Sequence, residues 1–86
     1  MTNKTMVNDI LDELEELKTD NTVPKNIKSK IEIIIPMLKE EKEFSMNISK
    51  AQAIIEEISE DNNIQTYTRT QIYNIASTLE TIQINN

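Results

Sequence analysis

The chain has no cysteine, no histidine and no glycine among its 86 residues. Without cysteine it forms no disulfide and supplies no thiolate. Without histidine and cysteine it has no Ser-His-Asp triad and no ordinary zinc site, and without glycine it has no Gly-rich phosphate-binding loop. Most familiar catalytic arrangements are therefore excluded, and we expect neither an enzyme nor a bound cofactor.

Aromatic residues and long apolar runs are also scarce. The only aromatic side chains are Phe44, Tyr67 and Tyr73, so aliphatic side chains must form the core, at about 1.5–3 kcal/mol for each one fully buried. No run of about eighteen apolar residues is present, which argues against a transmembrane helix. The segment MTNKTMVNDILDELEEL turns acidic where a signal peptide would be apolar. These features predict a cytoplasmic protein.

The charge balance is acidic, with a net charge of −6 and a pI near 4.5. Affinity for nucleic acid comes mainly from Lys and Arg that neutralise phosphates, and anionic membrane surfaces also attract basic segments. We therefore expect no nucleic acid and no membrane as partner. A protein partner or a homo-oligomer is the expected class of interaction.

What the sequence does contain is an internal repeat. Residues 14–40 align without a gap on residues 55–81, and seven of the 27 aligned positions are identical. The paired stretches are TDNTVPKNIKSKIEIIIPML and EDNNIQTYTRTQIYNIASTL. A period near forty residues is typical of helical hairpin repeats.

Each copy of the repeat has the apolar spacing of a helix, a short loop and a second helix. The apolar faces of the four expected helices are Val7, Ile10, Leu11, Leu14 and Leu17; Ile27, Ile31, Ile34, Ile35 and Leu38; Ile48, Ala51, Ile54, Ile55 and Ile58; and Ile72, Ile75, Ala76, Leu79 and Ile82. Pro24 suits the first turn of the second helix, and Pro36 is expected to bend it. Thr68 and Gln71 have the spacing of a capping box, although the fourth helix could instead start at Thr66. No window keeps a period of two, so no sheet is expected.

The predicted fold is all-α, in one domain spanning residues 1–86. We expect a hairpin at about residues 4–40, a linker at 41–46 and a second hairpin at about 47–83. Four helices joined by short loops favour a closed up-and-down bundle. The alternative is two hairpins stacked side by side as in HEAT repeats, which usually need three or more copies.

The repeated loop suggests a device that fixes the corner of each hairpin. Asp61 is expected to accept hydrogen bonds from free N–H groups at the start of the fourth helix, and Arg69 to reach back to the same carboxylate. Asp20 and Lys28 occupy the equivalent positions of the first copy, where Lys lacks the two-pronged geometry of Arg.

The stretch EEISEDNNIQTYTRTQIYNIASTLE resembles the most characteristic part of a small archaeal family, classed as an uncharacterised protein family (UPF class). The resemblance is strongest over residues 54–82, and its most specific part is the run from Thr68 to Ile72. This chain departs from the pattern at Asn62 and Gln65, where prolines are expected, and at Tyr73, where Trp is expected. The resemblance implies a four-helix up-and-down bundle and an archaeal origin, and it implies no activity.

Acidic residues of the first helix form the weak metal candidate of the sequence. Asp9, Asp12, Glu13 and Glu16 are spaced three or four residues apart, so their oxygens could face Mg²⁺ or Ca²⁺. Such carboxylates more commonly form a solvated face, and bundles that bind two iron ions use histidines that this chain lacks. A small-ligand or divalent-metal binder is the alternative function.

The leading hypothesis is a non-catalytic protein-interaction module or assembly subunit. Ile33 and Met37 lie four residues apart on a flank of the second helix, away from its inner face. Phe44 and Met46 in the acidic linker are expected to extend this apolar surface.

Overall fold

The computed structural model describes residues 2–82, and this part of the chain holds four α-helices and no strand. They are α1 (Asn3–Thr19), α2 (Lys25–Lys39), α3 (Phe44–Ser59) and α4 (Thr66–Thr81). The all-α prediction is therefore confirmed. The expected linker at 41–46 is too long, because α3 already begins at Phe44 and leaves residues 40–43 between α2 and α3.

The ends of the helices follow from local chemistry. The hydroxyl of Thr2 accepts a hydrogen bond from the Thr5 N–H at 3.1 Å and caps α1. Pro24 is the N-cap of α2, where its missing N–H costs nothing. The capping box at Thr68 is not formed, because α4 begins at Thr66 and Thr68 is a buried residue inside the helix. The alternative start, Thr66, is the correct one.

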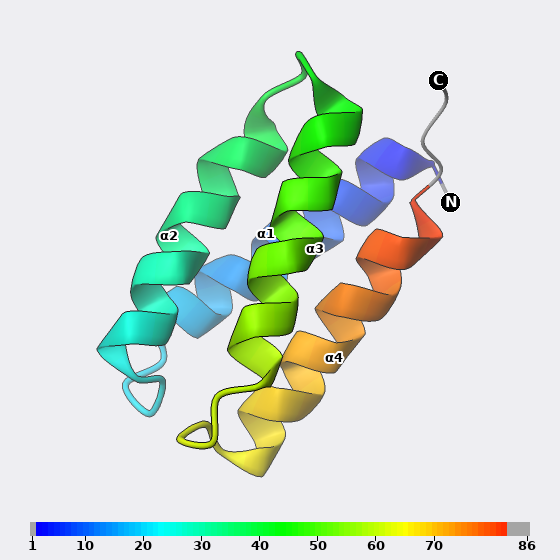
Figure 1. Cartoon of the computed structure of the whole chain (residues 1–86). Coiled ribbons are helices and arrows are strands. Elements are labelled where there is room, and N and C mark those ends of the chain that lie inside the picture. Colours follow the sequence, from blue (N-terminus) through cyan, green and yellow to red (C-terminus); the bar gives the residue numbers. More distant parts are fainter. Residues whose placement is uncertain (1, 83–86) are drawn as a thin grey trace.

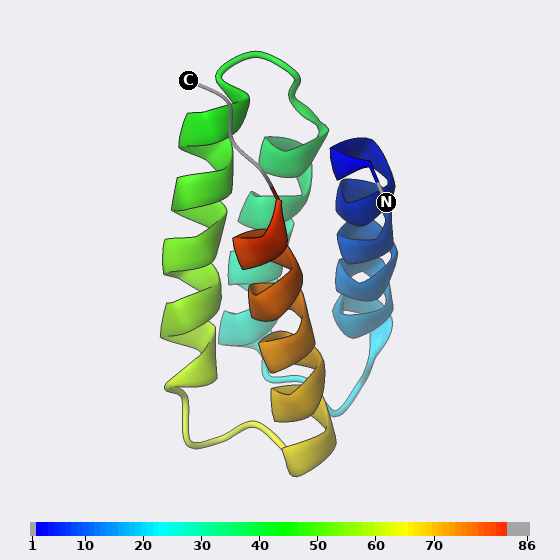
Figure 2. The same cartoon turned by 90° about the vertical axis from the view of Figure 1, so that its right-hand side faces the viewer.

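The four helices form a closed ring. α1 packs against α2, α2 against α3, α3 against α4, and α4 against α1. Figure 2 shows α1 and α3 on opposite sides with α2 and α4 between them. Two stacked hairpins would instead place α1 on α3 and α2 on α4, so the closed bundle is confirmed over the stack.

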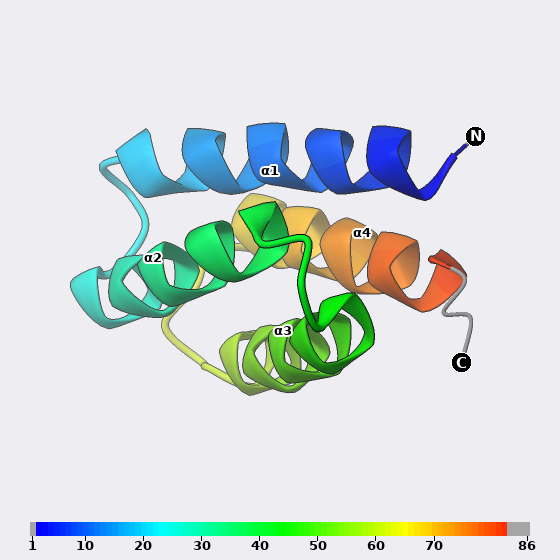
Figure 3. The ribbon, with the colours of Figure 1, turned by 90° about the horizontal axis from the view of Figure 1, so that it is seen from above.

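The axes of the four helices are not all aligned with one another. In Figure 1 α1 runs diagonally behind α3, while α2, α3 and α4 are closer to one direction. Figure 3 shows α1 along its length and the other helices foreshortened. Because short loops join antiparallel neighbours, the start of α1, the end of α2 and the start of α3 all lie at one end of the bundle.

The core is almost entirely aliphatic. Its fully buried side chains are Ile10, Leu14, Leu17, Ile27, Ile31, Ile34, Ile48, Ile55, Ile58, Ile72, Ile75 and Leu79. The faces expected from helical spacing point inward, although Leu11, Ile54 and Ala76 are only partly buried at the edge of the core. Met6 was not expected in the core but is buried at the start of α1. No helix among residues 2–82 is long and apolar enough to cross a membrane.

Candidate functional site

Three polar contacts run along the seam between α2 and α3. The side-chain amide of Asn47 donates to the Met37 carbonyl at 3.1 Å. Further along, the ammonium of Lys30 lies 3.4 Å from the Glu57 carboxylate, and Asn26 donates to Asp61 at 3.2 Å. These contacts fix the register of the two helices.

Each of the two helices that form this seam carries an exposed apolar side chain. Ile33 is 54% exposed and Met46 is 48% exposed. Met37 is partly buried against the core. Ile33 lies one helical turn before Met37 on α2. On α3, Met46 is the residue before Asn47, whose side-chain amide donates to the Met37 carbonyl. We call Ile33, Met37 and Met46 the seam patch.

Phe44 does not belong to the seam patch. It is the first residue of α3 and packs partly buried against the core. It also lines a hollow of about 350 Å³ at the end of the bundle where α1 begins and α2 ends. Phe44 therefore does not extend the exposed apolar surface as expected, because it packs against the core, whereas the place of Met46 in that surface stays a prediction.

The two aspartates of the repeated loop have the same local geometry. Asp20 accepts hydrogen bonds from the Thr22 N–H at 2.8 Å and from its hydroxyl at 2.7 Å. Asp61 accepts from the Asn63 N–H at 2.7 Å. Both carboxylates thus close a turn onto the residue two positions on. Neither caps the following helix, which corrects the expectation for Asp61.

Arg69 fixes the second corner through the backbone. Its guanidinium donates to the carbonyl oxygens of Ser59 and Asp61, the latter at 2.8 Å. These carbonyls lie at the end of α3, where the helix leaves its last acceptors without N–H partners. The prediction that Arg69 links α4 back to the end of α3 is correct in position. The predicted hydrogen bond to the Asp61 carboxylate is wrong, because Arg69 donates to the backbone carbonyl of Asp61 instead.

Lys28 occupies the equivalent position in the first copy of the repeat and makes no such bridge among residues 2–82. Its charge only helps to lower the pKa of Asp20, after the two hydrogen bonds from Thr22. The first corner relies on the backbone, where the Asp20 N–H donates to the Leu17 carbonyl at 3.2 Å. The two copies therefore share their turns and differ in their side-chain bridge.

The corner carboxylates make stability depend on pH. Hydrogen bonds lower the pKa of Asp20 through Thr22 and that of Asp61 through Asn63 and Asn26, so both folded pKa values lie below those of the unfolded chain. Their stabilisation is full above about pH 4, the unfolded value, and is lost as the pH falls through the folded values. Urea denaturation between pH 5 and pH 2 should therefore show a decline that is shallower in Asp20→Asn/Asp61→Asn. An unchanged decline in this variant would contradict the assignment.

The pKa of Glu13 is shifted in the opposite direction, upward. Burial, followed by the charges of Glu16 and Asp9, raises its pKa. Its folded form therefore holds a proton more tightly than the unfolded chain does, so its contribution to stability falls as the pH rises through the raised pKa. Glu13 is the one member of the acidic face that is held partly out of water between α1 and α4.

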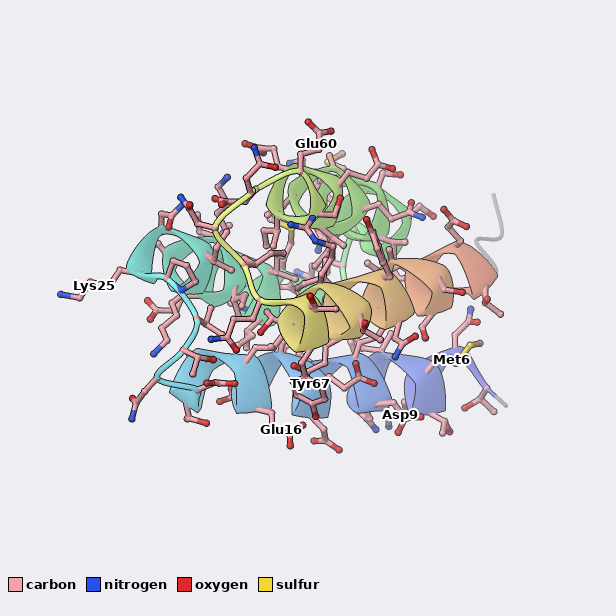
Figure 4. The ribbon with its side chains drawn as sticks, turned by 90° about the horizontal axis from the view of Figure 1, so that it is seen from below. Met6, Asp9, Glu16, Lys25, Glu60 and Tyr67 are labelled. Carbon is pink, nitrogen blue, oxygen red and sulfur yellow. The ribbon has the colours of Figure 1, made fainter. Side chains whose placement is uncertain are left out.

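The other acidic candidates are exposed, although Asp9 also lines the hollow that holds Glu13. Asp9, Asp12 and Glu16 are exposed, and Figure 4 shows Asp9 and Glu16 on the outer side of the helix. Among residues 2–82, no three acidic side chains come together as a group able to hold a metal ion. Within residues 2–82, the metal alternative therefore has no assembled site.

Two features of these surfaces were missed in the sequence. Arg69 was predicted to bind a carboxylate because a sequence shows which side chains are charged. It does not show which backbone carbonyls at a helix end lack N–H partners. The hollow beside Phe44 was missed because its lining joins residues 3–11 to residues 38–44, two segments that are far apart in the chain. Among the described residues, the exposed isoleucine at position 33 could be identified from its position on the helical wheel alone.

Comparisons with known proteins agree with this architecture. A relative from Methanosarcina mazei is 35% identical over 80 residues, covering 92% of this chain and 86% of the relative. A relative from Pyrococcus furiosus is 41% identical over 79 residues, covering 90% of this chain and 85% of the relative. Both are described as UPF0147 proteins.

Solved structures show the same fold. A crystal structure from Thermoplasma acidophilum, described as a protein of the uncharacterized family UPF0147, superposes with a TM-score of 0.88 at 27% identity. The match covers 94% of this chain and 96% of that one. A second crystal structure, of a protein of unknown function, has a TM-score of 0.83 at 38% identity and covers 92% and 91% of the two chains.

The family model described as "Uncharacterised protein family (UPF0147)" matches residues 1–82. The resemblance inferred from the run between Thr68 and Ile72 is thereby confirmed, and so is its archaeal setting, since the relatives come from archaea. The chain belongs to the uncharacterised protein family UPF0147.

Proposed function

We propose that the protein is a non-catalytic interaction module that binds another protein chain through the seam patch. One observation carries the proposal. Among residues 2–82, Ile33 is the single isoleucine that is exposed, while every other one is buried or partly buried. The other isoleucines stabilise the fold by burial, whereas Ile33, at 54% exposed, contributes less burial to folding than they do.

The surroundings of the seam patch support a contact surface. Met46 on α3 adds a second exposed apolar side chain, and Met37, one helical turn after Ile33 on α2, is partly buried against the core. Methionine side chains are flexible and adapt to varied partner surfaces. Lys30 and Glu57 form a polar border at one end. An apolar centre with a polar rim is the usual anatomy of a protein interface.

A non-catalytic role is supported by the lack of histidine and cysteine in the chain. The remaining candidates for acid–base chemistry are carboxylates. Glu13 has a raised pKa, and it lies in a shallow hollow between α1 and α4. Its neighbours there are Asp9, Met6 and the hydroxyl side chains of Ser77, Thr78 and Thr81. The chain has no histidine to activate these hydroxyls.

The test is capture of partners by the tagged protein from an extract of its own organism, followed by mass spectrometry. Ile33→Glu/Met46→Glu is expected to lose at least about 90% of a reproducible partner, because two charges would be buried in an apolar contact. Met37 is kept, since it packs on the core and its loss would confuse binding with stability.

The matched control is Tyr67→Glu/Tyr73→Glu, which adds the same charge at exposed positions on α4. Because α4 packs against α1 and α3 and not against α2, which carries Ile33 and Met37, this control should keep the partner. Circular dichroism must show that both variants remain folded. Equal loss of the partner in both variants, or full retention in the seam-patch variant, would refute the proposed surface.

Self-association is separated from binding to a different protein by light scattering coupled to gel filtration. A dimer that becomes a monomer in Ile33→Glu/Met46→Glu identifies a second copy of this chain as the occupant. A monomer at all concentrations, together with a captured protein, identifies a different chain.

A further inference from the structure

Two of the contacts between helices are equivalent by the sequence repeat. The repeat pairs α1 with α3 and α2 with α4, so the α1–α4 contact corresponds to the α2–α3 contact. The α2–α3 contact is tied by polar bonds from Asn26, Lys30 and Asn47. Among the bonds of residues 2–82, none joins a side chain of residues 4–19 to α2, α3 or α4. From residue 4 onward, α1 is therefore held in the bundle by apolar packing.

The two contacts also differ in chemistry at equivalent positions. The α1–α4 contact contains a hollow lined by Met6, Asp9, Glu13, Ser77, Thr78 and Thr81. In the register of the repeat, Thr78 corresponds to Met37, and Glu13, one residue before the aligned stretch, corresponds to Ile54. Met37 and Ile54 both pack against the core. A hydroxyl and a carboxylate thus stand where the other copy has apolar side chains that stabilise the bundle by burial.

In the part of the chain that the structure describes, Glu13 receives no hydrogen bond from α4. The hydroxyls of Thr78 and Thr81 donate instead to carbonyls of their own helix, at 3.0 and 2.9 Å. The carboxylate is partly buried, so it loses hydration without gaining a donor in exchange. Partial burial of a charge on these terms costs free energy.

The charge of Glu13 is therefore disfavoured while α1 lies against α4. Burial, followed by the charges of Glu16 and Asp9 on the same helix, raises the pKa of Glu13 above its ordinary value of 4.5. Among residues 2–82, no charge on α2 or α4 adds to this shift, and the α4 side of the hollow carries hydroxyls. Because the folded pKa is the higher one, the stabilisation is full below the ordinary value and is lost as the pH rises through the raised value.

We infer that α1 separates from α4 while α2, α3 and α4 stay packed, and that the carboxylate charge of Glu13 promotes this opening. α1 moves rather than α4, because Arg69 ties α4 to the end of α3. Figure 3 shows α1 on one side of the bundle, with α2 and α4 beneath it and α3 on the far side, so α1 can leave without displacing another helix. Opening uncovers the apolar surface that Ile10, Leu14 and Leu17 cover in the closed form.

This inference is independent of the proposed protein contact, because the seam patch lies on α2 and α3. It is tested by native-state amide hydrogen exchange, followed by NMR on the isotope-labelled full chain at about pH 7. Leu14 in α1 and Ile55 in α3 are repeat equivalents, and both are 0% exposed. The Leu14 amide should be protected at least about 10-fold less than the Ile55 amide, as expected for a helix that opens before the whole molecule unfolds. Ile72 in α4 should be protected like Ile55.

Glu13→Gln tests the role of the carboxylate, because it keeps the shape of the side chain and removes its charge. At about pH 7 it should raise the protection of the Leu14 amide roughly 3-fold, the size of a single partly exposed charge interaction. The difference from the unmodified protein should disappear by about pH 4, where Glu13 itself carries a proton. The matched control is Asp12→Asn, which removes an exposed charge of α1 outside the hollow and should leave the protection unchanged.

The separate opening of α1 would be overturned by equal protection of Leu14 and Ile55 with the same dependence on urea, since α1 would then open only with the whole molecule. Equally low protection of Leu14 and Ile72 would overturn it as well, because both end helices would then open alike. The role of Glu13 would be overturned by unchanged protection in Glu13→Gln or by an equal gain in Asp12→Asn.

Discussion

Ile31→Ala is expected to lower the free energy of unfolding by about 2–5 kcal/mol. Ile31 is 0% exposed in the centre of α2, so the change removes buried atoms and leaves a cavity. An 86-residue domain has about 4–13 kcal/mol of stability in total. This single change is therefore expected to remove much of the free energy of unfolding. Urea denaturation followed by circular dichroism measures the loss directly.

The sequence repeat supplies a matched second site. Ile72 is the repeat equivalent of Ile31 and is also 0% exposed, in α4. Ile72→Ala should cost a similar amount, because the two residues hold equivalent places in the two hairpins. The control is Ile33→Ala, the same substitution two residues further along at an exposed position, with an expected change within about 0.5 kcal/mol. A loss at Ile33 as large as that at Ile31 would show that the burial described here is wrong.

Arg69→Met is expected to destabilise the fold by roughly 2 kcal/mol, because hydrogen bonds from charged donors contribute about 1.5–3 kcal/mol and water replaces part of this loss. The guanidinium joins α4 to the carbonyls of Ser59 and Asp61, so the change frees acceptors at the end of α3. Arg69→Lys should recover only part of the loss, because one ammonium group lacks two parallel donors.

Lys28→Met is the matched control for Arg69. It stands at the same position of the first repeat, and it makes no side-chain bridge among residues 2–82. Its expected change in the free energy of unfolding is within about 0.5 kcal/mol. Hydrogen exchange should also show faster opening of the last turn of α3 in Arg69→Met, with the last turn of α1 unchanged in Lys28→Met. Equal effects at both corners would refute the role assigned to Arg69.

Much of the fold was predictable because apolar spacing is local information. The inner face of α2 is complete as predicted, from Ile27 to Leu38. The start of α3 was misplaced by three residues because acidic Glu43 and the residues before it suggested a longer linker. Glu43 instead adopts a left-handed backbone conformation with φ of 54°, which turns the chain sharply into the helix at Phe44. A left-handed non-glycine residue has no strong signal in a sequence.

The sequence by itself determined the helices, the repeat, the aliphatic core and the family, since each depends on residues close in the chain or on a contiguous pattern. Only the tertiary structure decided that α1 closes the ring against α4, that Arg69 binds carbonyls rather than a carboxylate, and that Phe44 faces a hollow instead of joining Ile33. The physical reason is the same in each case. These features depend on which groups remain unpaired or uncovered after the helices have packed, and that outcome is not a local pattern in the sequence.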